Sequence, residues 1–265
     1  MQNKIGFIGA GNMTTAMVNG ILTADFMCAE NIFVYDILPE KFKFFTDLGV
    51  NFTENAQKII DNCDFIFLAM KPQSLKKSLE NLNFSAGKCV VSIAAGVDIA
   101  TLKSYIAQKN AIIRAMPNTP ILVGEGATAI AICESVTSNQ VDFIAKLFET
   151  SGMCVEVDES AINTITALSG SGPAYFFKIA KSATEFAKST NLNSKLALKL
   201  FAQTMTGAGK MLLEGDKTPE ELIDAVASKG GTTEAALKFF DENNFEEIII
   251  SAMNAAKNRA DELAE

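Results

Sequence analysis

Short, largely apolar segments alternate with helix-like segments through the first 158 residues of the chain. Because such strands have no polar face to turn toward water, they pack in a parallel sheet that helices cover on both sides. The sequence therefore predicts a doubly wound α/β domain. The expected strands are Lys4–Ile8, Ile32–Tyr35, Phe65–Ala69, Cys89–Ile93, Ile112–Ala115, Ala127–Ile132 and Met153–Val157. The expected helices are Asn12–Ala24, Pro39–Leu48, Glu54–Asn62, Pro72–Asn81, Asp98–Gln108 and Ser138–Thr150.

The strand pattern stops near Asp158, and every later segment has helical spacing. We therefore expect an α/β domain over residues 1–158 and an all-helical domain over residues 159–265. The expected helices of the second domain are Pro173–Thr190, Ser194–Glu214, Pro219–Ala227, Thr233–Glu242 and Phe245–Leu263. The second of these helices carries an apolar stripe from Leu196 to Leu212, with small residues at 207–209. The stripe fits either an ordinary core or a subunit interface.

The composition excludes several classes of function. The chain has no histidine, so a histidine general base and a histidine metal ligand are impossible, and we expect no metal site. A net charge of −8 leaves no basic face for nucleic acid. The five scattered cysteines form no C-x-x-C pair, which is typical of reduced thiols in the cytoplasm. No segment reaches the roughly 18 continuous apolar residues that span a bilayer, so no membrane partner is expected.

A glycine-rich turn joins the first expected strand to the first helix, in the sequence Gly-Phe-Ile-Gly-Ala-Gly-Asn-Met. This turn is typical of a Rossmann dinucleotide-binding domain, in which Gly9 permits the tight turn and Gly11 lets a pyrophosphate approach the backbone. Thr14 stands where the usual fingerprint has Gly or Ala, so the motif by itself is incomplete. The alternative is a glycine turn that binds nothing.

Asp36 ends the second expected strand, about 25 residues after Gly11. An acid at this position accepts hydrogen bonds from the ribose 2′-hydroxyl and repels a 2′-phosphate, which favours NADH over NADPH. The following residues include no arginine and offer only Lys41 and Lys43 as cations. If Asp36 instead caps the helix that begins at Pro39 and faces solvent, NADPH becomes acceptable again.

Together with the glycine turn, four further segments closely resemble pyrroline-5-carboxylate reductases, and they follow one another in the same order. The resemblance covers practically the whole chain. It implies reduction of 1-pyrroline-5-carboxylate to L-proline by NAD(P)H, the last step of proline biosynthesis. It also implies a Rossmann domain followed by a helical domain that binds substrate and dimerises, with dimers assembling into larger rings. The four segments are Phe67–Gln73, Met116–Pro120, Ala167–Tyr175 and Ser228–Leu237.

The same resemblance implies a role for each site residue. Thr233 is expected to contact the pyrroline nitrogen, and Asp216 lies near the family's site unless it is a solvated cap residue. The expected substrate-binding residues are Ser228, Gly230, Gly231, Thr232, Thr233 and Asp216. The expected cofactor-binding residues are Gly9, Ala10, Gly11, Asn12, Met13, Asp36, Asn55, Ala69, Met70, Lys71, Pro72, Met116, Pro117 and Asn118. The chain departs from the family at Lys229, where proline is usual.

Two other functions stay open. A β-hydroxyacid dehydrogenase has a similar glycine turn, and Gly170-Ser171-Gly172 with Lys178 imitates its catalytic segment, although Ser182 stands where that family has asparagine. A non-catalytic regulator that binds NAD(P)H is the second alternative. The missing histidine favours the reductase, because a protonated cyclic imine is already electrophilic and needs no strong acid.

Overall fold

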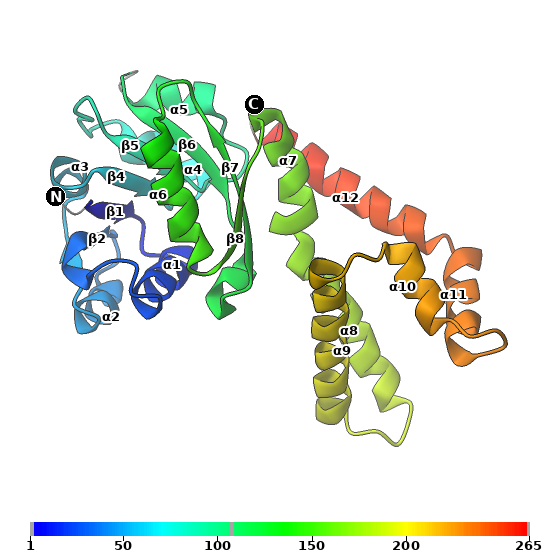
Figure 1. Ribbon diagram of the computed structural model, residues 1–265. Helices are drawn as coiled ribbons and strands as arrows, with labels where there is room; N and C mark the ends of the chain where they lie inside the picture. Colours follow the sequence, from blue (N-terminus) through cyan, green and yellow to red (C-terminus); the bar gives the residue numbers. More distant parts are fainter. Residues whose placement is uncertain (1–2, 107–108, 264–265) are drawn as a thin grey trace. The chain divides into compact units, whose positions relative to one another are not determined.

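The computed structural model describes residues 3–106 and 109–263, and the chain forms two compact units (Figure 1). Unit 1 consists of Met1–Ser171 and Ala256–Glu265, and unit 2 consists of Gly172–Ala255. The domain boundary expected after Asp158 marks the end of the strands and stays a prediction.

Unit 1 is built on one eight-stranded sheet with the order β3-β2-β1-β4-β5-β6-β7-β8. Neighbouring strands are parallel except for β6 and β7, which are antiparallel. The doubly wound α/β class expected from the sequence is therefore confirmed. The strands are β1 (Ile5–Ile8), β2 (Ile32–Tyr35), β3 (Asn51–Thr53), β4 (Phe65–Leu68), β5 (Cys89–Ser92), β6 (Ala111–Met116), β7 (Gly126–Ile132) and β8 (Gly152–Glu156).

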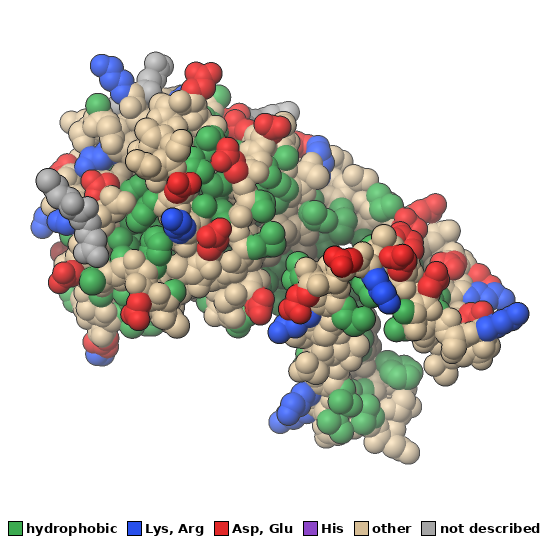
Figure 2. All heavy atoms as spheres, in the orientation of Figure 1, with side chains coloured by type: hydrophobic (Ala, Val, Ile, Leu, Met, Phe, Trp, Pro, Cys, Tyr) green, Lys and Arg blue, Asp and Glu red, His purple; other side chains and the backbone are tan. Residues whose placement is uncertain are grey.

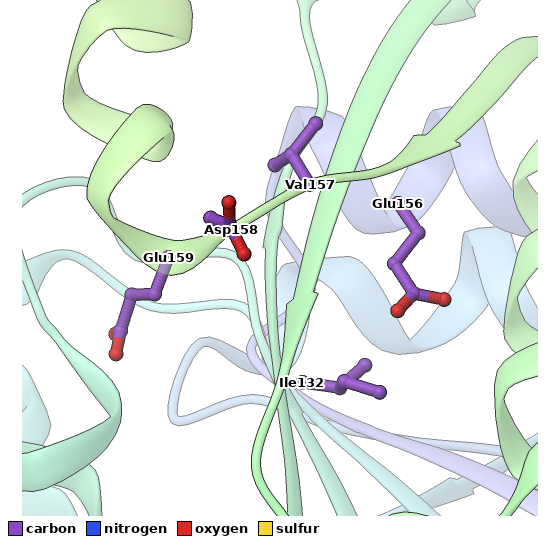
Figure 3. A pocket seen from close by; sticks show the side chains of 5 residues that line it. All are labelled: Ile132, Glu156, Val157, Asp158 and Glu159. Carbon is purple, nitrogen blue, oxygen red and sulfur yellow. The ribbon is translucent and has the colours of Figure 1, made fainter.

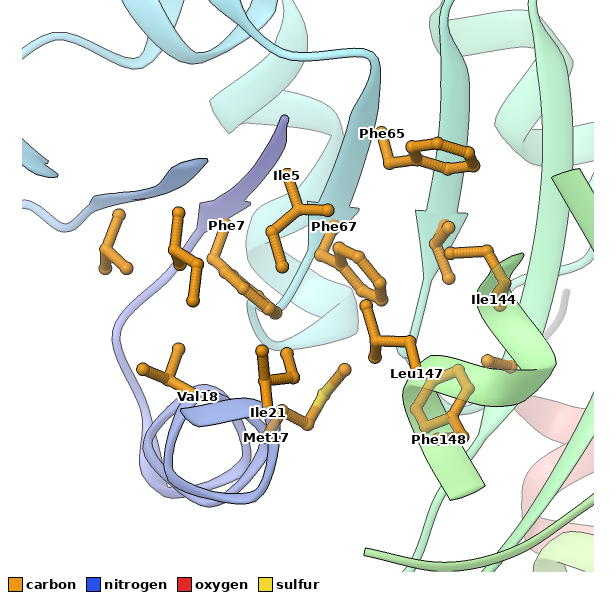
Figure 4. Close-up of a cluster of buried hydrophobic side chains, with 14 of the residues drawn as sticks. Ile5, Phe7, Met17, Val18, Ile21, Phe65, Phe67, Ile144, Leu147 and Phe148 are labelled. Carbon is orange, nitrogen blue, oxygen red and sulfur yellow. The ribbon is translucent and has the colours of Figure 1, made fainter. Parts of the chain in front are cut away.

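Successive residues of the central strands point to opposite faces of the sheet, and both sets are apolar. Helices therefore cover both faces, and each face has its own core. Phe7 and Phe67 face α1 and α6, and their rings stack with centroids 4.7 Å apart (Figure 4). Ile8 and Leu68 belong to the core on the other face, with α3, α4 and α5. The helices are α1 (Asn12–Thr23), α2 (Phe42–Asp47), α3 (Ala56–Asn62), α4 (Pro72–Leu79), α5 (Ile99–Tyr105) and α6 (Ser138–Glu149). Four 3₁₀ turns join them, η1 (Ala29–Asn31), η2 (Pro39–Lys41), η3 (Thr119–Val123) and η4 (Glu159–Ala161). Residues 107–108, at the end of the helix expected over Asp98–Gln108, lie outside the described residues.

A π-helical segment that the sequence pattern did not predict ends the first part of unit 1. The short helix α7 (Ile162–Ile165) continues into η5 (Thr166–Gly170), and the Ser171 amide donates to the Thr166 carbonyl at 2.8 Å. π-helical turns are rare and are frequent at functional sites.

A buried polar network fastens the last turns of α12 (Phe245–Glu262) to unit 1. The Arg114 side chain is 4% exposed, and it donates to Asn163 Oδ1 at 2.6 Å and lies 3.6 Å from Glu159. Asn163 in turn donates to Asp261 at 2.8 Å, and Lys257 pairs with the same carboxylate. Asn163 thus links the chain's buried arginine to the end of α12.

Unit 2 is helical, and many of its large apolar side chains are uncovered. It contains α8 (Gly172–Lys188), α9 (Ser194–Glu214), α10 (Pro219–Val226), α11 (Thr232–Glu242) and the first part of α12. Leu200 and Leu213 on α9 are 55% and 75% exposed, and apolar side chains gather over α8 and α9 (Figure 2). Exposed apolar surface of this extent marks an interaction site. Over the described residues, none of the helices is long and apolar enough to cross a membrane.

Candidate active site

The glycine turn follows β1 at the point where the sheet's connections change direction. From β1 the chain runs outward through β2 and β3, and then returns to the other side of β1 with β4. The Gly9 amide donates to the Tyr35 carbonyl at 2.8 Å, and the Ala69 amide donates to the Ile8 carbonyl at 2.9 Å. Ligands of open α/β sheets bind at this switch point, beyond the carboxyl ends of the strands.

Gly9 is required by the protein itself. Its φ of +111° lies in a region that residues with a Cβ rarely adopt. A Cβ at this position would also lie 2.5 Å from the Ala69 carbonyl oxygen. The glycine therefore allows β1 and the segment after β4 to approach closely.

Unlike Gly9, Gly11 is not required by its backbone conformation or by a neighbouring protein atom. Its φ of −72° suits any residue, and a Cβ here would meet no protein atom within 4 Å. The space above Gly11 is open, and the first turn of α1 carries no acidic residue. The amides of this turn have no partner within the helix, so the turn fits an anion such as a pyrophosphate. Asn12 and Met13, the first helical residues, lie where such an anion would sit.

Thr14 explains why this glycine turn departs from the usual fingerprint. Its side chain is fully buried, and its hydroxyl donates to the Gly9 carbonyl oxygen at 2.7 Å. The hydroxyl thus closes the turn from inside and satisfies its own polar group. In the sequence, Thr14 makes the fingerprint incomplete. In the structure, its hydroxyl stabilises the turn through the hydrogen bond to Gly9.

Asp36 reaches back to the glycine turn. Its Oδ2 accepts a hydrogen bond from the Ala10 amide at 2.6 Å, and its Oδ1 accepts one from the Leu38 amide at 3.0 Å. Each carboxylate oxygen keeps a further lone pair. The carboxylate therefore bridges the glycine turn and the residue that precedes η2.

Three more groups of expected cofactor residues follow other strands at the same edge of the sheet. Lys71 is the exposed N-cap of α4, and Pro72 occupies its first turn, directly after Ala69 and Met70. Asn55 caps α3 after β3, since its Oδ1 accepts a hydrogen bond from the Gln57 amide at 2.8 Å. Met116 ends β6, and Pro117 and Asn118 follow it. The fold thus brings all the expected cofactor residues of unit 1 to one edge.

The side chain of Asn118 is committed to the protein. It is 7% exposed, donates to the Ser169 carbonyl at 3.1 Å and accepts from the Ala127 amide at 2.9 Å. Ser169 and its neighbour Gly170 belong to η5, and sequence reasoning assigned neither of them to the site. The Ser-Gly-Ser-Gly run at 169–172 was the available signal.

The expected substrate residues lie in unit 2, and all of them except Asp216 occur in the turn that opens α11 and in its first residues. Gly230 has a φ of +72°, and the Gly231 amide donates to the Ser228 carbonyl at 2.9 Å. The Gly230 amide donates to Glu234 at 2.6 Å. Two amides of the expected substrate residues are therefore already paired within the protein, whereas those of Thr232 and Thr233 have no partner within the helix.

Asp216 lies in the exposed connection between α9 and α10, and its carboxylate makes no hydrogen bond or ion pair within the described residues. Its role near the substrate stays a prediction.

An acidic hollow in unit 1 lies away from the glycine turn. It measures about 430 Å³ and adjoins β7 and β8, at the far end of the sheet from β2 (Figure 3). Its carboxylates are those of Glu156, Asp158 and Glu159, and Glu159 accepts from the Ile99 amide at 2.6 Å. A hollow lined by three carboxylates repels an anionic cofactor, so we place the active site at the glycine turn.

Comparison with known proteins agrees with this geometry. Residues 159–263 match the family model "Pyrroline-5-carboxylate reductase dimerisation", and residues 4–96 match "NADP oxidoreductase coenzyme F420-dependent". The pyrroline-5-carboxylate reductase of Pseudomonas aeruginosa is 36% identical, over 99% of this chain and 97% of that protein. The Escherichia coli enzyme of the same name is 35% identical, over 100% and 99%.

Solved structures give the same assignment. A pyrroline-5-carboxylate reductase from Coxiella burnetii superposes with a TM-score of 0.90 and 34% identity, covering all of both chains. The Plasmodium falciparum pyrroline carboxylate reductase with NADP bound gives a TM-score of 0.92 and 29% identity, over 100% of this chain and 99% of that chain. The chain therefore belongs to the pyrroline-5-carboxylate reductase family.

Proposed function

We propose that this chain reduces 1-pyrroline-5-carboxylate to L-proline and prefers NADH as the reductant. Membership of the family makes the chain an NAD(P)H-dependent oxidoreductase. The observation that carries the substrate assignment is the start of α11, where unpaired amides and the Thr233 hydroxyl occur together after two glycines.

The substrate carboxylate is expected to bind the amides of Thr232 and Thr233. The Gly230 and Gly231 amides shape the turn through their bonds to Glu234 and Ser228. Lys229 adds an exposed cation beside this anion site, which favours an acid substrate.

The reaction needs orientation more than acid catalysis. The bound cofactor supplies a hydride, which forms a new C–H bond at the imine carbon of the substrate. The π electrons of the C=N bond become the lone pair of the amine nitrogen, so a protonated imine gives a neutral amine. The Thr233 hydroxyl bonds the ring nitrogen and fixes the imine carbon for attack. No histidine is required.

Oxidation of the reduced nicotinamide, followed at 340 nm in the presence of 1-pyrroline-5-carboxylate, tests the proposal. A regulator would bind NADH without consuming it. A β-hydroxyacid dehydrogenase would oxidise a hydroxy acid and lose that activity when Lys178 is replaced. Lys178 is exposed on α8, outside the turn that opens α11. Either result would remove the reductase assignment.

The preference for NADH rests on Asp36. Its carboxylate is held beside the glycine turn by the Ala10 amide, and the residues after it include no arginine for a 2′-phosphate. We expect Asp36→Ser to shift the NADH-to-NADPH ratio of kcat/KM by about tenfold toward NADPH, or ~1.4 kcal/mol. Steady-state kinetics with each cofactor measure the ratio. Asp47→Ser, on α2, is the matched control, and an unchanged ratio in Asp36→Ser would remove the basis for the preference.

The chain associates with itself through the family's dimerisation region, and we propose that dimers assemble further into rings. Light scattering at micromolar concentration should give at least a dimer, and Leu200→Glu should reduce the mass because a charge would enter an apolar interface. Asn19→Glu, on the exposed side of α1, adds the same charge in unit 1 and should leave the mass unchanged. A stable wild-type monomer would contradict the interface.

The cytoplasm is the compartment we propose, since all five cysteines are free. Burial raises the pKa of Cys63, Cys89 and Cys154 to about 12, so these thiols stay protonated and unreactive.

A further inference from the structure

Both polar groups of the Asn118 side chain are hydrogen-bonded to the protein, so neither is left over for a ligand in the simplest arrangement. Its Oδ1 accepts from the Ala127 amide at 2.9 Å, and its Nδ2 donates to the Ser169 carbonyl at 3.1 Å. The partners fix the orientation of the side-chain amide, because one is a donor and the other an acceptor. The side chain is 7% exposed. Both ends of this amide therefore serve the protein.

The two hydrogen bonds join three segments that are distant in sequence. Ala127 lies at the start of β7, Asn118 follows β6, and Ser169 belongs to the π-helical segment η5. Beside them, a Cβ on Gly170 would lie 2.5 Å from the Met116 methyl group. The end of η5 thus packs directly on Met116, and Asn118 sets the spacing between them.

This cluster lies on the side of the switch point where a nicotinamide belongs. The two halves of a dinucleotide bind the two halves of a doubly wound sheet. Asp36 follows β2 and marks the adenosine half, which leaves the strands from β4 to β6 for the nicotinamide. Met116 ends β6 at that edge.

We infer that Asn118 is a positioning residue that holds Met116 against the end of η5. Met116 and η5 then form the surface that positions the nicotinamide and the substrate imine for hydride transfer. This role rests on the proposed function, and it differs from a direct contact between Asn118 and the cofactor. The pyrophosphate and adenosine sites do not depend on it. Loss of Asn118 therefore affects hydride transfer more than cofactor affinity.

Asn118→Asp tests the role with an isosteric change. An ionised aspartate still accepts from Ala127 but places an oxygen against the Ser169 carbonyl. A protonated aspartate can donate to that carbonyl again, and burial raises the pKa of such a group. No titratable side chain occurs in η3, η5 or β7. Arg114 of β6 is committed to Asn163 and Glu159, and Glu125, the residue before β7, is exposed.

We expect kcat of Asn118→Asp to be ten- to a hundredfold below wild type at about pH 8, because small displacements at a reacting centre cost this much. The variant-to-wild-type ratio should rise as the pH falls to about 6, and the NADH dissociation constant should change by less than about threefold. Asn62→Asp, an exposed asparagine of α3, is the control and should show neither effect. Unchanged kcat would overturn the role, and so would an equal loss of NADH affinity, since that result would indicate direct contact.

Gly170→Ala gives an independent test if Asn118→Asp fails to fold. The new Cβ displaces only the flexible end of Met116, so the fold should persist while kcat falls and NADH affinity stays. Fluorescence of bound NADH in both variants reports the nicotinamide surroundings without turnover. A spectrum identical to wild type would overturn the inference. If the wild-type protein itself does not turn over 1-pyrroline-5-carboxylate, that result would overturn only the proposed function.

Discussion

Replacing Thr233 by alanine is expected to reduce kcat by roughly ten- to a thousandfold while the protein stays folded and binds NADH normally. The alternative role for Thr233 is to cap α11, and such a role would make the variant less stable by ~1 kcal/mol with little loss of turnover. The structure favours the catalytic role, because α11 begins at Thr232 with Gly231 as its N-cap and no side chain caps the helix. The hydroxyl of Thr233 is thus available to the substrate.

Two further variants isolate the hydroxyl group. Thr233→Ser keeps it and should retain most of kcat, whereas Thr233→Val keeps the shape and should behave like the alanine variant. Stopped-flow hydride transfer, NADH titration and thermal melting are measured on all three. Wild-type turnover in Thr233→Val would remove Thr233 from the catalytic residues.

Gly11→Val is expected to weaken NADH binding on the order of a hundredfold or more, with a melting temperature within a few degrees of wild type. The valine side chain would enter the open space above Gly11, where the pyrophosphate is expected to bind, and its Cβ would meet no protein atom within 4 Å. Its backbone conformation suits any residue. The change therefore blocks the ligand without straining the fold.

Gly9→Ala is the matched comparison, because it changes the same turn by a smaller side chain. Here φ is +111° and the Ala69 carbonyl lies 2.5 Å from the new Cβ, so stability should fall by at least ~1–2 kcal/mol. NADH titration and urea unfolding separate the two effects. Gly11→Val that binds NADH as wild type does would place the pyrophosphate elsewhere.

Strands and helices with a strong local pattern were predictable from the sequence. The strand Ile32–Tyr35 has the predicted bounds, and α1 ends one residue before its predicted end at Ala24. The strand β3 was missed because Asn51, Phe52 and Thr53 include one apolar residue and lie at the edge of the sheet. The segment α7–η5 was missed because Thr, Ser and Gly at 166–170 are weak helix formers. Packing on Met116 and the bond to Asn118 support this segment, and neither is visible locally.

In the candidate site too, features with a local sequence pattern were predictable, and features that depend on tertiary contacts were not. Its glycines and Asp36 were found from their spacing, since motif and strand end coincide in the sequence. The bond from Ala10 to Asp36 depends on the pairing of β1 with β2, and periodicity does not give its geometry. The pairing of the Gly230 amide with Glu234 depends on a side-chain rotamer. Such contacts decide which expected ligand groups are free, and they require coordinates.

The return of α12 to unit 1 affects the order in which the protein is built during translation. Residues 256–265 complete unit 1 but leave the ribosome after all of unit 2. Until then Asn163 lacks the Asp261 carboxylate, and the loop at Gly96 lacks Leu263, whose Cβ packs against it. The nascent nucleotide-binding unit therefore lacks these contacts while the helices of unit 2, with their exposed apolar side chains, are being synthesised. Closure of unit 1 therefore follows the synthesis of unit 2.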